Sequence, residues 1–157
     1  GIVISLCQTQ CAIQSQLAGL KHLNRLENVL AKAELQDSVF EGLMLNHLGF
    51  VIEGTMSNVF FEKDAVLYTP SLMLSGVEGV MRQMIIEYCQ KNSLVLNIEN
   101  IKMHTPLQFD SAFICNSVMG ILPIKKIKNE NLSIGPITQK LQMALSSEEL
   151  NGSSIES

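Results

Sequence analysis

A single domain of mixed α and β structure is the fold class that this sequence predicts. Its 157 residues fit one domain of ordinary size. Short β-branched runs separated by turn residues indicate strands, and three stretches repeat apolar residues at helical spacing. Because several strands follow one another as hairpins, we do not expect a doubly wound parallel sheet.

The N-terminal part of the chain predicts one strand, one helix and then a group of strands. Residues 2–6 form a short β-branched run that is typical of a buried strand. After an irregular polar stretch at 8–20, apolar residues recur at helical spacing over residues 22–35. The strands that we expect next occupy residues 39–45, 50–53, 58–61 and 65–68, with a turn at 46–49 and a hairpin turn at 62–64.

The C-terminal part predicts two helices with strands between them. Two glycines open a helix expected from Gly76 to about Tyr88, and Pro136 lies near the first position of a helix that continues through Leu145. In the strand expected last, Pro123 indicates an edge or a bulge. The strands expected here occupy residues 94–98, 111–115 and 120–127, and residues 147–157 form a Ser, Glu and Gly-rich tail that we expect to be flexible.

Composition and charge exclude several classes of function. The formal net charge of -4 and the lack of a long basic stretch argue against nucleic-acid binding. No apolar run reaches the length of a membrane span, and the opening residues lack the basic start of a signal peptide. Only 17% of the residues are charged, which favours a surface partly covered by a partner domain or subunit.

The spacing of cysteines and histidines predicts no metal site. The four cysteines contain no CxxC pair, so we expect reduced thiols, mostly in the core of a cytoplasmic protein. The histidines form neither an HxH nor an HxxxH pattern. The residues concerned are Cys7, Cys11, Cys89, Cys115, His22, His47 and His104.

Two charged residues lie where they could carry chemistry. Lys21 stands at the start of the first predicted helix, where the macrodipole disfavours an ammonium and favours the neutral amine that imine formation needs. Glu53 ends an apolar strand, where a buried carboxylate requires a partner such as a protonated ring nitrogen. Taken alone, each is more often a solvated surface residue.

Two further segments could contact an anion or a substrate. In SGVEGVMRQ two glycines precede a helix, so backbone N–H groups are available for a phosphate, although simple helix initiation is the commoner reason. The segment has no GxxxxGK[ST] pattern. Asn116 and Ser117 follow an apolar strand, where polar side chains line a site about as often as they form a plain turn.

Four segments are informative because of their sequences and the order in which they follow one another. They read LAGLKHLNRLENVL, GFVIEGTMSNVFF, YTPSLMLSGVEGVMRQ and ICNSVMGILPI. Each resembles the corresponding segment of the aminodeoxychorismate lyases, which are pyridoxal-phosphate enzymes of the branched-chain aminotransferase (fold type IV) superfamily. The resemblance spans about residues 1–145.

The resemblance implies a fold and a domain organisation. Residues 1–146 would form the large, C-terminal, cofactor-binding domain, with mixed sheets in a pseudo-barrel and flanking helices, and residues 147–157 would be a tail. No segment resembles the smaller N-terminal domain of the family. We therefore expect these residues to hold only part of an active site, with little activity alone, and the family also implies a homodimer.

The resemblance also implies roles for particular residues. Lys21 would bind pyridoxal 5'-phosphate through an imine and then act as the proton-transfer base. Glu53 would pair with the pyridine nitrogen. The other implied contacts are backbone N–H groups for the phosphate from Gly79, Val80 and Met81, packing on the ring by Val77, and contact with phosphate or substrate by Asn116 and Ser117. Asn58 would brace the turn that carries Glu53.

The reaction implied is the conversion of 4-amino-4-deoxychorismate to 4-aminobenzoate and pyruvate, a step that feeds folate synthesis. A first alternative is a branched-chain or D-amino-acid aminotransferase of the same fold. The KHLNRLE wording disfavours it, because branched-chain enzymes typically have a glycine-rich sequence after the lysine. A second alternative is a non-catalytic domain.

Overall fold

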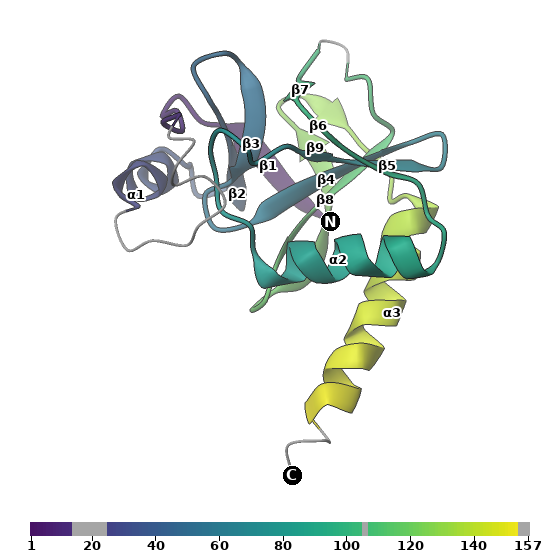
Figure 1. The fold of residues 1–157 in the computed structure, drawn as a ribbon. Coiled ribbons are helices and arrows are strands. Elements are labelled where there is room, and N and C mark those ends of the chain that lie inside the picture. Colours follow the sequence, from purple (N-terminus) through teal and green to yellow (C-terminus); the bar gives the residue numbers. More distant parts are fainter. Residues whose placement is uncertain (14–24, 105–106, 154–157) are drawn as a thin grey trace.

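A computed structural model describes residues 1–13, 25–104 and 107–153, with side chains through residue 146. The described part contains three helices and ten strands, and the strands form one mixed sheet (Figure 1). The helices are α1 (Leu26–Ala33), α2 (Val80–Lys91) and α3 (Pro136–Ser153). The strands are β1 (Ile2–Leu6), β2 (Glu41–Leu45), β3 (Phe50–Gly54), β4 (Asn58–Lys63), β5 (Val66–Pro70), β6 (Leu96–Glu99), β7 (Ile101–Lys102), β8 (Ser111–Asn116), β9 (Gly120–Ile127) and β10 (Glu130–Asn131).

The sheet has the order β6-β5-β4-β8-β9-β1-β2-β3-β7, and β10 pairs with β9. Three neighbouring pairs are parallel, namely β1 with β2, β1 with β9, and β5 with β6. The other ladders are antiparallel, including the β2–β3, β4–β5 and β8–β9 hairpins. This confirms a mixed sheet and the absence of a doubly wound arrangement.

Alternation along β4 divides the core between the two faces of the sheet. Phe60 packs with α2 and α3 and stacks on Phe113, with ring centroids 5.0 Å apart. Phe61 points to the other face, where it stacks on Phe109 at 4.7 Å. Successive strand residues face opposite sides, so a pair of adjacent phenylalanines supplies both clusters. Figure 1 shows α2 and α3 together below the sheet and α1 at its other end, beside β2 and β3.

Helix α1 covers a smaller hydrophobic cluster beside β2 and β3. Ala31 of α1 is buried against Met44 of β2 and Ile52 of β3. The segment after β1 is tied to the same helix, because Glu34 accepts the backbone N–H groups of Gln8 and Thr9, each at 2.7 Å. Helix α1 is therefore fixed both to the sheet and to the chain that leads toward residue 14.

The predicted elements are found, with informative differences at their ends. Helix α2 begins at Val80 rather than Gly76, because the backbone before it is not helical: Gly76 has a φ of +91° and Gly79 is extended; residues 76–79 are called the turn before α2 below. Helix α3 continues to Ser153, beyond the predicted end near Leu145. The short strands β7 and β10 lacked a sequence signal of their own.

Pro123 does not lie on an edge strand. β9 is flanked by β8 and β1, so the edge prediction is wrong. The β1–β9 register shifts between Ile2 and Val3, opposite residues just after Pro123, so an irregularity does lie beside this proline. An imino acid that cannot donate to a ladder is accommodated where the pairing is interrupted.

The described residues contain no cluster of His, Cys, Asp and Glu suited to a metal ion. The cysteines are free thiols, as predicted; Cys7 is half-buried, and the remaining three, Cys11, Cys89 and Cys115, are buried. No helix in the described part of the chain combines the length and the apolar character needed to cross a membrane.

Candidate active site

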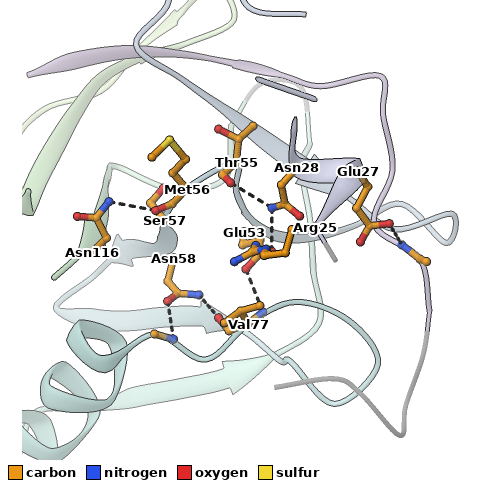
Figure 2. Close-up of polar contacts among 12 residues, drawn as sticks. Arg25, Glu27, Asn28, Glu53, Thr55, Met56, Ser57, Asn58, Val77 and Asn116 are labelled. Atoms are coloured by element: carbon orange, nitrogen blue, oxygen red, sulfur yellow. Dashed lines mark hydrogen bonds and ion pairs between the residues drawn. The ribbon is translucent and has the colours of Figure 1, made fainter. Parts of the chain in front are cut away.

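Glu53 lies near the end of β3, where it is almost fully buried and surrounded by hydrogen-bond donors (Figure 2). Arg25, just before α1, donates from Nη2 to Oε1 of Glu53 at 2.8 Å. Asn28, one helical turn later, approaches the same oxygen at 3.4 Å. The other oxygen, Oε2, accepts the backbone N–H of Val77 at 3.0 Å. The carboxylate therefore joins β3, α1 and the turn before α2.

Opposing effects act on the ionisation of Glu53. Burial raises the pKa of its carboxyl, because the charged form loses solvation, while the Arg25 guanidinium and the bonds from Val77 and Asn28 lower it. Asn28 is held by a second bond, from its Nδ2 to the carbonyl oxygen of Thr55 at 3.1 Å. A carboxylate can accept about four hydrogen bonds, and the described residues make three to Glu53, which leaves one lone pair without a donor among them.

The turn between β3 and β4 is held by a second buried carboxylate, Glu41 of β2. It accepts the backbone N–H groups of Thr55 and Met56, each at 3.1 Å, and the hydroxyl of Ser57 at 3.0 Å. The hydroxyl of Thr55 also donates to it. Neutral donors thus compensate this charge, and they fix the chain between Glu53 and Asn58.

Asn58, at the first position of β4, holds the turn before α2. Its Nδ2 donates to the carbonyl oxygen of Val77 at 2.8 Å, and its Oδ1 accepts the backbone N–H of Gly79 at 3.0 Å. The sequence indicated that Asn58 braces the turn carrying Glu53; its bonds in fact go to residues 77–79. That turn lies 19 to 21 residues further along the chain, so no local pattern shows the contact.

The N-terminus of α2 offers open backbone donors. Gly79 is the N-cap residue, it has no side chain, and no side chain in the described part of the protein caps the helix. The first amides of a helix have no partner within the helix, so those of Val80 and Met81 are available to an anion. The N–H of Gly79, predicted to contact a phosphate, is instead engaged by Asn58.

The remaining predicted site residues differ in their contacts and exposure. Asn116 bonds to two turns: Nδ2 donates to the carbonyl oxygen of Met56 at 3.0 Å, and Oδ1 accepts the N–H groups of Val118 and Met119. Ser117 is exposed in the turn after β8. Val77 is half-buried beside Glu53. Lys21 lies outside the described residues.

Sequence reasoning assigned no role to Arg25 or Asn28. Arg25 is the fourth residue after Lys21, and Asn28 follows three residues later on the same helical face. The available signal was an arginine at the start of a helix in a sequence that contains a buried strand-end glutamate. Arg82 was also missed; it is buried, bonded to Glu78 and to the carbonyl oxygen of Pro70, and its Nε has no partner among the described residues.

These residues fit a phosphorylated pyridine. Glu53 is a buried carboxylate with a lone pair to spare for a protonated ring nitrogen. The uncapped amides of Val80 and Met81 fit a phosphate. The buried hydroxyl of Ser75, beside this turn, lacks a partner in the described part of the chain.

The candidate site therefore combines a strand-end carboxylate with an open helix N-terminus, both held by the turn that contains Val77. The chain belongs to the class IV amino-transferase family, whose model matches residues 2–127. It is similar to the aminodeoxychorismate lyase of Vibrio harveyi, with 41% identity over 147 residues that cover 90% of this chain and 54% of that protein. The D-alanine aminotransferase of Bacillus licheniformis is 31% identical over 130 residues, which are 80% of this chain and 46% of that one.

A solved structure supports the same relationship. The crystal structure of 4-amino-4-deoxychorismate lyase from Pseudomonas aeruginosa matches with a TM-score of 0.90 and 40% identity, over 94% of this chain and 55% of that one. The fold predicted from the sequence is thereby confirmed. The chain spans about half the length of these relatives.

Proposed function

We propose that these residues form the cofactor-binding part of a pyridoxal-phosphate-dependent lyase, which converts 4-amino-4-deoxychorismate to 4-aminobenzoate and pyruvate. The observation that carries the proposal is the arrangement around Val77. Its N–H bonds to Glu53 and its carbonyl oxygen bonds to Asn58, so the carboxylate and the open end of α2 are held by one turn. The identity to the Vibrio harveyi lyase favours this member of the family.

Each residue has a defined task in this proposal. Glu53 would hold a proton on the ring nitrogen, and Val80 and Met81 would bind the phosphate through their amides. Lys21 would bind the cofactor through its Nζ and then take the proton from the substrate carbon that bears nitrogen. When bound, pyridoxal phosphate supplies the electron sink that makes this carbon acidic.

Arg25 supports Glu53 in this role. A buried carboxyl tends to be protonated, and a protonated Glu53 could not hold a positive ring nitrogen. The guanidinium at 2.8 Å opposes that tendency, because it favours the carboxylate form of Glu53. Arg25 is a positioning residue, since it acts on the chemistry through Glu53.

The choice between elimination and amino transfer follows from the substrate. In 4-amino-4-deoxychorismate, loss of the proton and departure of the enolpyruvyl group leave an aromatic ring. We expect aromatisation to drive this elimination, whereas an ordinary amino acid has no such outlet and its nitrogen is transferred to a keto acid.

The test is an activity assay of the complete protein as it occurs in the cell. We expect 4-aminobenzoate and pyruvate in equal amounts from 4-amino-4-deoxychorismate, with no requirement for a keto-acid acceptor. Amino transfer to 2-oxoglutarate without an aromatic product would overturn the lyase proposal. It would support the aminotransferase alternative, which the similarity to D-alanine aminotransferase keeps open.

A chemical test addresses the cofactor separately from turnover. Borohydride reduction after incubation with pyridoxal phosphate should place a pyridoxyl group on Lys21, located by peptide mapping. Failure of the complete protein to form any adduct would favour a non-catalytic domain. The homodimer and cytoplasmic location that the family implies are part of the proposal, and light scattering of the complete protein tests the first.

A further inference from the structure

Asn58 makes two bonds to the turn before α2, and these bonds have opposite directions. The amide nitrogen donates to Val77 and the amide oxygen accepts from Gly79, so both halves of the side chain are used on residues two apart (Figure 2). Such a pair fixes the turn as an additional strand residue would. Asn58 is almost fully buried, so solvent does not compete strongly for either bond.

The two long helices of this fold begin in different ways. At α3, Glu62 accepts the N–H groups of Ile137 and Thr138 at 3.2 and 3.3 Å, so that helix has a carboxylate cap. At α2, the side chain of Asn58 bonds to the N-cap residue Gly79 rather than to the first-turn amides. The Asn58 side chain thus holds the helix start without closing it.

Glycine at position 79 is required by this arrangement. A Cβ on Gly79 would lie 2.6 Å from Oδ1 of Asn58, and the next atom it would approach, Cγ of the same residue, is 3.8 Å away. The backbone itself, with φ at -75°, would accept alanine. The absence of a side chain at 79 therefore serves the bond to Asn58, and it also leaves α2 without a capping group of its own.

Asn58 is itself firmly placed. It pairs with Cys115 in the β4–β8 ladder, and the turn that precedes it is held by Glu41. Asn116 adds a bond to Met56 in that turn. Asn58 and Glu53 therefore lie at the two ends of one fixed turn. Through its two bonds, Asn58 holds residues 77–79 in a fixed position relative to Glu53.

We propose that Asn58 is a positioning residue for the phosphate end of the site: by holding residues 77 and 79, it keeps the amides of Val80 and Met81 open and directed at a bound phosphate. The inference rests on the proposed function only in naming that phosphate. The loss should fall mainly on the phosphate end, because Glu53 also accepts the N–H of Val77 but keeps its bonds from Arg25 and Asn28 when Asn58 is replaced.

The first test uses no cofactor. In Asn58→Ala, the amide of Gly79 loses its acceptor, so its hydrogen exchange should accelerate at least tenfold relative to the parent protein. Inorganic phosphate should shift the amide resonances of Val80 and Met81 in the parent and shift them less in the variant. Unchanged exchange and unchanged phosphate shifts would overturn the proposal whether or not the protein is a lyase.

The second test compares pyridoxal phosphate with pyridoxal, which lacks the phosphate. Asn58→Ala should weaken binding of pyridoxal phosphate about tenfold and leave pyridoxal binding within about twofold. An equal loss for both ligands would show a general structural role and overturn the proposal. If Lys21 of the parent forms no adduct with either ligand, the proposed function fails, and the phosphate titration still decides the role of Asn58.

Asn92→Ala is the matched control. Asn92 stands at the other end of α2, where its Nδ2 donates to the carbonyl oxygen of Tyr88 at 2.9 Å. The same substitution therefore removes a side-chain bond from the same helix, far from its N-terminus. It should leave both the ratio of the two ligand affinities and the exchange of the Gly79 amide unchanged.

Discussion

Arg25 and Glu53 join the start of α1 to the end of β3 through an ion pair of 2.8 Å, in which the guanidinium is about a quarter exposed and the carboxylate is almost completely buried. The partners thus differ in what they lose when the pair is broken. A solvated arginine can return to water, whereas Glu53 would retain an uncompensated charge in the interior.

Arg25→Met should destabilise the protein in a pH-dependent way. Burial raises the pKa of Glu53 above its ordinary value of 4.5, and loss of Arg25 raises it further. A carboxyl with a raised folded-state pKa contributes its full stability below the ordinary value, and this contribution is lost as pH rises through the folded-state pKa. We expect a loss of about 1–3 kcal/mol near pH 7 that shrinks toward zero near pH 4, measured by urea unfolding.

Glu53→Gln provides the control for that prediction. A neutral side chain at 53 removes the need for a cation, so Arg25→Met should cost much less in this background than in the parent. The pH dependence of the difference should disappear as well. A loss that is equal at both pH values in the parent background would contradict the ion-pair explanation.

Glu62→Gln should weaken the attachment of α3. The carboxylate accepts from Ile137, and from the backbone and the hydroxyl of Thr138. Glutamine keeps one acceptor oxygen, turns its NH₂ toward donors and removes the charge that favours a helix N-terminus, so we expect a loss of about 1–2 kcal/mol. Urea unfolding measures it, and exchange of the amides at 137 and 138 should accelerate. Glu87→Gln on the exposed face of α2 should change stability by less than about 0.5 kcal/mol.

The effect of Gly79→Ala on stability should have opposite signs in the parent protein and in the Asn58→Ala background. In the parent, the new methyl group meets Asn58, so we expect destabilisation by roughly 1 kcal/mol. In Asn58→Ala the obstacle is gone and the backbone suits alanine, so the same substitution should be neutral or stabilising by about 0.5 kcal/mol. A double-mutant cycle by thermal unfolding checks this, and additive effects would exclude the contact as the cause.

The cysteines should resist alkylation in the folded protein. Burial raises the pKa of Cys7 and of Cys89 to about 11 and that of Cys115 to about 12; burial also raises the pKa of Cys11. Little thiolate is present at neutral pH, and the thiolate is the reactive form. Intact mass after iodoacetamide treatment at pH 7 should show little labelling, and four adducts after unfolding in urea. Rapid modification of buried Cys89 or Cys115 would contradict this packing.

Most of the strands were predictable, because alternation and turn residues are local signals. The start of α2 was not, since Gly76, Val77 and Gly79 resemble a helix opening. Val77 is prevented from entering the helix by side chains of Glu53 and Asn58, which are 24 and 19 residues away. Contacts of that kind are decided by the fold and leave no local pattern.

The candidate site could be predicted in outline from the resemblance of sequence segments to a family, and not from local physical signals. Glu53 is buried and the amides of Val80 and Met81 are uncapped, as the prediction requires, and their role in binding a cofactor stays a prediction. The partners of Glu53 were missed, because an arginine and an asparagine on a helix predict nothing without the sheet beside them. Contact of Asn116 with a ligand also stays a prediction; in the structure its amide bonds to two neighbouring turns.

The place of β1 between β2 and β9 has a consequence for the order of folding. Ile2 pairs with Ile124, so during synthesis β1 waits for about 120 further residues before its second neighbour exists. A chain with such distant pairings closes slowly, and the apolar edge of β1 is exposed in the meantime. The pairing of β1 with β9 is therefore expected to be a late step of folding, completed only after β9 has been synthesised.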